Sequence, residues 1–228
     1  MNLLKIYSLA AAVLLLMFIL VQDIFSASFE IGERLKYDFK YGIINAGTHT
    51  MEVSDLDTIN GKITYKLRSE TTSNNFVDTF YKVRDEFSSW IDTSSMATMK
   101  FTKSLNEGKY TSNYSVRFDY DEMKAYSSKD TVISIDSYMH DVLSLFYYIR
   151  TLNLSVGDTI NMKSFDNDEV TAFNLKVMGE EKVKVPSGKY KCLIIEPYIE
   201  GDFLFKYEGN LKIWLSKEKP HLPVLMKS

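Results

Sequence analysis

The sequence contains little cysteine, proline or glycine. Its 228 residues include one Cys, 4 Pro and 10 Gly. A single cysteine excludes an intramolecular disulfide and a cysteine-rich metal cluster, and the low proline and glycine content excludes a low-complexity or fibrous chain. The one thiol, Cys192, lies in a Lys-Cys-Leu-Ile-Ile run that reads as a strand facing a core. We therefore expect Cys192 to be buried and inert.

The chain also lacks an excess of charge of either sign. It has 27 basic and 30 acidic side chains, for a formal net charge of −3. This balance excludes a strongly basic nucleic-acid-binding protein, so we expect no nucleic-acid partner. The hydrophobic fraction of 45% is typical of a globular domain, and 15 Tyr and 14 Phe make the chain rich in aromatic residues.

The N-terminal segment differs in composition from the rest of the chain. Lys5 precedes an uncharged run from Ile6 to Val21, and the small residues Ser26, Ala27 and Ser28 follow. This order is typical of a secretory signal peptide, which we predict over residues 1–28 with cleavage after Ser28. An uncleaved membrane anchor and a buried core helix are the alternatives. A lipoprotein signal is excluded, because no cysteine is available at the cleavage site.

Side chains in the remaining 29–228 alternate with a period of two. Leu35 to Tyr41 alternates between apolar and charged residues, which predicts a half-buried strand. The Asn60-Gly61 pair predicts a tight turn within one long hairpin over residues 47–70. Pro186-Ser187-Gly188 predicts a second tight hairpin. No linker divides the chain, so we expect one β-rich domain over 29–228.

One helix interrupts this pattern. Apolar residues with helical spacing predict an amphipathic helix over Tyr138–Leu152, with Asp136 or Ser137 as its N-cap. Residues 74–81 remain ambiguous between a loop and one helical turn. The expected fold is mainly β: an antiparallel curved sheet, forming a half-barrel or a near-closed barrel, with one short packed α-helix. Residues 223–228 begin a strand pattern and stop, which we interpret as truncation at the C-terminus.

Several strings occur together that resemble the bacterial exported family called domain of unknown function 3108. They are Gly32–Tyr37, Tyr41–Gly47, Phe80–Asp85, Glu107–Tyr110, Asp141–Arg150, Pro186–Tyr190 and Ile213–Ser216. The resemblance implies a signal peptide, a location in the bacterial periplasm or cell envelope, and a curved antiparallel sheet with a short helix. It implies no activity and no site residues.

The sequence offers no recognisable catalytic or metal-binding motif. His49, His140 and His221 lie on different predicted elements and lack the close spacing of a zinc site. Asp166 begins a run that resembles a calcium loop, but Thr171 stands where such a loop needs glycine. We therefore predict no catalytic residues, no metal and no cofactor, and a protein that is not an enzyme. An enzyme with dispersed site residues is the second alternative to the function given next.

Aromatic residues on the strands are the best functional lead. Rings on one face of a curved sheet can line a cavity for an acyl chain, and they can equally fill the core between sheet and helix. The candidate lining residues are Tyr37, Phe39, Tyr41, Tyr110, Tyr114 and Phe118. The leading hypothesis is an exported envelope protein that binds an apolar or lipid-like ligand in this sheet. The first alternative is a structural or interaction module that meets another envelope protein.

Lysines flank the predicted Pro186 turn on both sides. At a period of two, these side chains share one face of the hairpin. They form either a basic patch for anionic groups or an ordinary solvated strand face. The residues concerned are Lys182, Lys184, Lys189 and Lys191.

Overall fold

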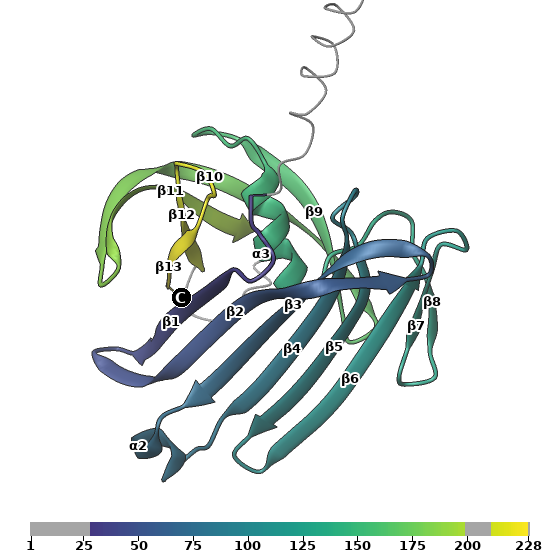
Figure 1. Cartoon of the computed structure of the whole chain (residues 1–228), viewed down its shortest axis with the longest axis horizontal. Helices are drawn as coiled ribbons and strands as arrows, with labels where there is room; N and C mark the ends of the chain where they lie inside the picture. The colour runs from purple at the N-terminus through teal and green to yellow at the C-terminus, as the bar shows by residue number, and fades with distance from the viewer. Residues whose placement is uncertain (1–27, 199–210, 228) are drawn as a thin grey trace, which may run out of the picture.

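The structure is a computed structural model that describes residues 28–198 and 211–227 (Figure 1). The predicted signal peptide lies outside these residues except for Ser28. The described chain is mainly β, with two antiparallel sheets and two helices, which confirms the expected fold class. None of the helices in the described ranges is long and apolar enough to cross a membrane.

The larger sheet is an eight-stranded meander in chain order. Its edges are β1 and β8, so the sheet stays open and corresponds to the half-barrel version of the expected fold. Its strands are β1 (Arg34–Tyr41), β2 (Ile44–Ile59), β3 (Lys62–Ser73), β4 (Arg84–Asp92), β5 (Thr98–Glu107), β6 (Tyr110–Asp119), β7 (Lys124–Ser127) and β8 (Val132–Ser134).

The smaller sheet has five strands in the order β13-β12-β11-β10-β9. These strands are β9 (Thr159–Asp166), β10 (Glu169–Val185), β11 (Gly188–Tyr198), β12 (Lys212–Ser216) and β13 (Pro223–Lys227). The polypeptide therefore divides its strands between two sheets, and α3 (Val142–Thr151) packs between them.

The hairpin turns follow the local sequence. Asn60 and Gly61 have φ values of 51° and 75°, the left-handed pair that a two-residue turn between twisted strands requires. Asn167 and Asp168 repeat this geometry between β9 and β10, with φ values of 50° and 74°. The predicted hairpins at Asn60-Gly61 and at Pro186–Gly188 are both present.

The long helix starts later than the sequence predicts. Its N-cap is Asp141, not Asp136 or Ser137, and the Asp141 carboxylate accepts hydrogen bonds from the backbone N–H groups of Leu143 and Ser144. Before the cap, the backbone of His140 pairs with β9. This pairing with a distant strand uses the backbone carbonyl of His140, which a helix that included His140 would need as an acceptor. The helix therefore does not extend back to Tyr138. In contrast, α2 (Asn75–Asp78) shows that the ambiguous segment 74–81 does contain a helical turn.

The helix α3 contributes to an apolar cluster on each of its two sides. Leu143 and Tyr147 of the helix pack with Met51, Leu67 and Ile91 of the larger sheet. On the other side, Ile149 joins an apolar cluster of the smaller sheet, which comprises Met162, Leu175, Ile195, Ile213 and Leu215. Burial of both helix faces holds the two sheets together.

A buried ion pair closes the junction between the sheets. The Arg150 side chain, at the end of α3, is fully buried and places both terminal nitrogens 2.7 Å from the Glu33 carboxylate. Its remaining N–H groups donate to the carbonyl of Ser28 at 2.8 Å and to that of Pro220 at 3.3 Å. Arg150 thus ties the segment before β1 and the β12–β13 turn to the helix.

Candidate binding surface

The structure divides the six predicted lining residues into an inner and an outer group. Tyr114 and Phe118 are 4% and 0% exposed, and Tyr37 is half-buried. Exposure rises along the same strands, to 55% for Phe39 and 82% for Tyr41. Tyr110 is likewise 55% exposed. The same face of the sheet is therefore covered at one end and open at the other.

The inner rings are packed against other side chains. Phe118 meets Phe165 of β9 edge-to-face at 5.2 Å and stacks on Tyr120 at 5.9 Å. Tyr114 donates a 2.9 Å hydrogen bond to Asp168, and burial together with this carboxylate raises the pKa of the Tyr114 hydroxyl. These contacts fill the interior around the two rings.

Two hollows in the described structure lie away from these rings, and the larger of the two is lined by polar side chains. One of about 470 Å³ lies on the outer face of β1–β3 and is lined by Arg34, Lys36, Thr48, Thr50, Glu70 and Thr72. A second, of about 290 Å³, is lined by Ser134, Ile135, Asp136 and Val170. None of the six predicted lining residues contributes to either hollow.

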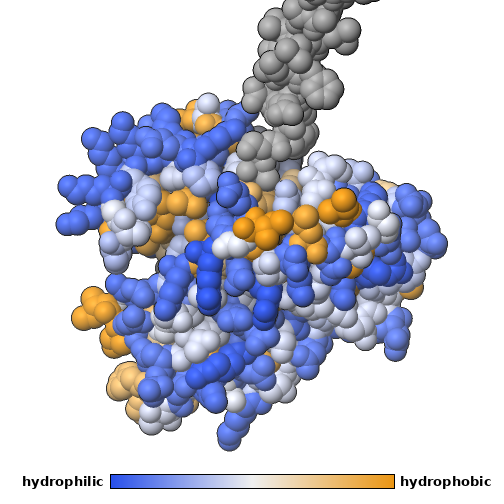
Figure 2. Space-filling model, in the orientation of Figure 1, coloured by the Kyte–Doolittle hydropathy of each residue, from blue (hydrophilic) through white to orange (hydrophobic). Residues whose placement is uncertain are grey.

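The outer aromatic residues belong to a larger apolar surface at one end of the larger sheet. In a meander, the β1–β2, β3–β4 and β5–β6 connections all emerge at the same end, and each carries exposed apolar side chains. We call this surface the apolar end. It comprises Phe39, Tyr41, Ile43, Ile44, Phe76, Phe80, Tyr81 and Tyr110. In Figure 2, hydrophobic atoms project from the left and lower-left margin, where Figure 1 places the β1–β2 tip and α2.

The connections of the apolar end are fixed to one another. Asn74 donates its backbone N–H to Ala46 at 2.9 Å, which joins the end of β3 to the start of β2. The Gly108 N–H donates to the Lys82 carbonyl at 2.7 Å, and Gly108 lies so close to the Tyr81 ring that an added Cβ would approach it to 2.8 Å. The exposed rings are thus held by ordered backbone.

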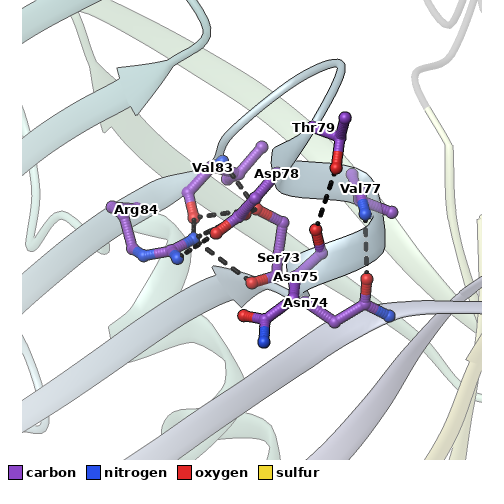
Figure 3. Close-up of polar contacts among 8 residues, drawn as sticks. All are labelled: Ser73, Asn74, Asn75, Val77, Asp78, Thr79, Val83 and Arg84. Carbon is purple, nitrogen blue, oxygen red and sulfur yellow. Dashed lines mark hydrogen bonds and ion pairs between the residues drawn. The ribbon is translucent and has the colours of Figure 1, made fainter.

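A polar network holds α2 in place (Figure 3). The Arg84 guanidinium contacts both carboxylate oxygens of Asp78, at 2.5 and 3.1 Å, and Ser73 also donates to this carboxylate. The Arg84 hydrogen bond holds the pKa of Asp78 below its ordinary value, with Ser73 as the next cause. The Asn74 side chain caps α2 by accepting from the Val77 N–H at 3.0 Å.

This network leaves the apolar residues of the segment facing outward. Phe76 and Phe80 are 64% and 78% exposed, and their rings meet edge-to-face at 5.8 Å. Neither Phe76 nor Phe80 was predicted as a surface residue, because segment 74–81 has no period-two alternation. Their signal was the presence of Phe and Tyr beside polar capping residues in a short connection.

The described residues contain no cluster of side chains placed to hold a metal ion. His49 and His140 lie on separate elements, and no group of three His, Cys, Asp or Glu side chains within 28–198 and 211–227 is placed to hold a metal ion. Burial lowers the pKa of His140 to about 4. The buried Asp141 accepts from Ser89 at 2.5 Å and from Thr98 at 2.7 Å, so its carboxylate serves the helix cap. Burial also raises the pKa of this carboxyl.

The predicted positions of Cys192 and of the lysine cluster are observed. Cys192 is fully buried, and burial raises the pKa of its thiol. The strand register of the β10–β11 hairpin places exposed lysines directly opposite one another. The opposed residues are Lys182 with Lys191, and Lys184 with Lys189.

The family model described as "Protein of unknown function (DUF3108)" matches residues 36–228. The chain belongs to the DUF3108 family. None of the curated proteins compared with it matches. Among solved structures, one similar chain is a beta-barrel-like protein of domain of unknown function DUF1849 from Brucella abortus. It shares 10% sequence identity with a TM-score of 0.49, over 84% of this DUF3108 chain and 88% of the other.

Proposed function

We propose that this DUF3108 protein is exported to the cell envelope and acts there by binding a partner at its apolar end. The observation that carries the proposal is the contrast within one sheet face. Phe118 of β6 is fully buried, whereas Tyr110 of the same strand is 55% exposed. Monomeric soluble proteins rarely expose contiguous apolar patches of more than a few hundred Å², and such patches are commonly interaction sites.

The fixed geometry of the apolar end supports a binding role. Exposed apolar side chains that serve no purpose are ordinarily scattered singly. Here they gather on adjacent connections, and the Arg84–Asp78 pair holds α2 with Phe76 and Phe80 outward. A preorganised surface loses little conformational entropy when a partner binds.

An apolar ligand enclosed in the sheet has less support from the geometry. The candidate rings Tyr114 and Phe118 pack against Asp168, Phe165 and Tyr120 instead of facing a hollow. A catalytic role has no supporting observation either, because the buried carboxylate of Asp141 is engaged in capping α3. The proposal of export rests on the signal-peptide pattern of residues 1–28.

Native mass spectrometry of the full-length protein purified gently from its own envelope tests this function. The wild-type protein is expected to retain a lipid or a protein partner. A Tyr41→Ser/Ile43→Ser/Phe80→Ser variant is expected to lose it, because these side chains are 82%, 99% and 78% exposed and can change without disturbing the core. The matched control is Leu56→Ser/Ile63→Ser, which changes exposed apolar residues of the β2–β3 hairpin at the opposite end. A bare wild-type polypeptide, or equal retention by both variants, would overturn the proposal.

A further inference from the structure

The β10–β11 hairpin concentrates positive charge on one face. Its register sets Lys182 directly opposite Lys191 and Lys184 directly opposite Lys189, and all four side chains are exposed. Like charges in directly opposed positions destabilise an antiparallel pair. Within the described ranges, none of these lysines has an acidic partner at ion-pair distance. The hairpin therefore presents a cluster of ammonium groups that no carboxylate of the described residues neutralises, and this cluster suits an anionic partner.

Lysines also accompany the exposed rings of the apolar end. Lys40 lies between Phe39 and Tyr41, Lys82 follows Tyr81, and Lys109 precedes Tyr110. All of these lysines are exposed. A lysine can lay its aliphatic stem along apolar surroundings while its ammonium group reaches the water. Tyrosine rings beside such lysines are typical of membrane–water interfaces.

In the view of Figure 1, the basic hairpin and the apolar end lie along neighbouring parts of the outline of the molecule. In Figure 1, the β10–β11 tip and the β1–β2 tip lie at the left, α2 lies at the lower left, and the β5–β6 tip lies at the bottom. Figure 2 shows a hydrophilic lobe at the left and hydrophobic atoms below it. Ile43, the most exposed large apolar residue of the described part of the chain, is 99% exposed at the apex of its hairpin. It protrudes from the tip of the hairpin, as a group that enters a fluid phase would.

We propose that the basic hairpin and the apolar end together bind the surface of an anionic phospholipid bilayer. The apolar tips enter the headgroup region, and the lysines of the β10–β11 hairpin face the lipid phosphates. The proposal rests on the proposed function, because it names the partner of the same apolar end. Interfacial binding of this kind combines buried apolar area with electrostatic attraction to anionic lipids.

Vesicle titration with a local fluorescent reporter tests the proposal. An environment-sensitive dye is attached to the purified protein through Ile43→Cys, and in a matched sample through Ile63→Cys. The native Cys192 is buried and does not compete for the label. With vesicles containing phosphatidylglycerol, emission from position 43 should shift to the blue while position 63 stays unchanged. Vesicles of phosphatidylcholine alone should produce little shift at either position.

Charge variants of the dye-labelled protein test the basic hairpin. Each lysine near an anionic surface contributes roughly a fivefold gain in partitioning. Lys184→Gln/Lys189→Gln should therefore raise the lipid concentration at half-saturation by about 30-fold. The control Lys124→Gln/Lys176→Gln removes the same charge from β7 and from the middle of β10, and should change it less than about threefold.

Three outcomes of these titrations would contradict the lipid proposal. An absent shift at position 43, an equal shift with neutral vesicles, or equal effects of the two lysine pairs would each contradict it. If native mass spectrometry still shows a protein or a second copy of the chain bound through the apolar end, the proposed function stands and its partner is a protein. If the wild-type polypeptide is also bare, both proposals fail.

Discussion

Glu33 and Arg150 form the contact whose removal should most affect stability. The Arg150 side chain is 0% exposed, and Glu33 is 16% exposed. The guanidinium also contacts the rings of Phe29 and Tyr147, at 5.5 and 5.2 Å from their centroids, so water has little access to it. Replacing one member of such a pair leaves an uncompensated buried charge.

The two single variants should differ in severity. Glu33→Ala leaves a fully buried cation with only backbone carbonyls as partners, and should lower the free energy of unfolding by about 3–5 kcal/mol. Arg150→Met leaves a carboxylate that is partly hydrated, and should cost about 1–3 kcal/mol. The Glu33→Ala/Arg150→Met double variant should lose less than the sum of the two, with a coupling energy of about 2 kcal/mol or more.

Urea denaturation of the wild type and the three variants, followed by near-ultraviolet circular dichroism, measures these differences. Unfolding curves with equal slopes allow the midpoints to be compared directly. A loss of less than about 1 kcal/mol for Glu33→Ala, or strictly additive losses in the double variant, would refute the assignment of this pair as a buried, coupled contact.

Three further predictions concern buried groups. Tyr147→Phe should leave the free energy of unfolding unchanged or raise it by up to about 1 kcal/mol, because the Tyr147 hydroxyl is buried without a hydrogen-bond partner among the described residues. Tyr120→Phe should lower the free energy of unfolding by about 1 kcal/mol, because the Tyr120 hydroxyl donates to a backbone carbonyl at 2.7 Å. Burial depresses the pKa of His140 to about 4, so the unfolded state should bind more protons than the folded state between pH 6.5 and about 4. The free energy of unfolding should therefore fall by about 3 kcal/mol as the pH is lowered through this window. His140→Phe should remove that part of the pH dependence in denaturation curves. Gly47→Ala should cost more than about 2 kcal/mol in the same assay, because its Cβ would lie 2.2 Å from the Thr72 carbonyl oxygen; a stability equal to wild type would contradict that close approach.

Period-two alternation predicted the strands because alternate side chains of a half-buried strand face the core and the solvent. The Asn60-Gly61 turn and the β10–β11 hairpin were also predictable, since both depend on local backbone preferences. The start of α3 was not, because it is decided by pairing of His140 with β9 and by hydroxyl groups brought to Asp141 from β4 and β5. Such contacts join residues far apart in the chain and leave no local pattern.

The candidate surface could be predicted only in part, because contacts between residues far apart in the chain also decide which of its rings are exposed. Alternation placed Tyr110 and Phe118 on one face of β6, and both positions have the same parity. It carried no information on how far α3 and the smaller sheet cover that face, so it could not separate the packed ring from the exposed one. Phe76 and Phe80 were outside the prediction for a different reason, because a single helical turn is too short to show a helical period.

Photo-crosslinking in living cells tests the central claim, that the protein works through its apolar end, most directly. A photo-reactive amino acid replaces Ile43 in one strain and Ile63 in another, which are 99% and 58% exposed at opposite ends of the larger sheet. Irradiation should give a discrete adduct from position 43, with a lipid or a protein, and none from position 63. Equal labelling at the two positions, or no adduct from position 43, would contradict the account.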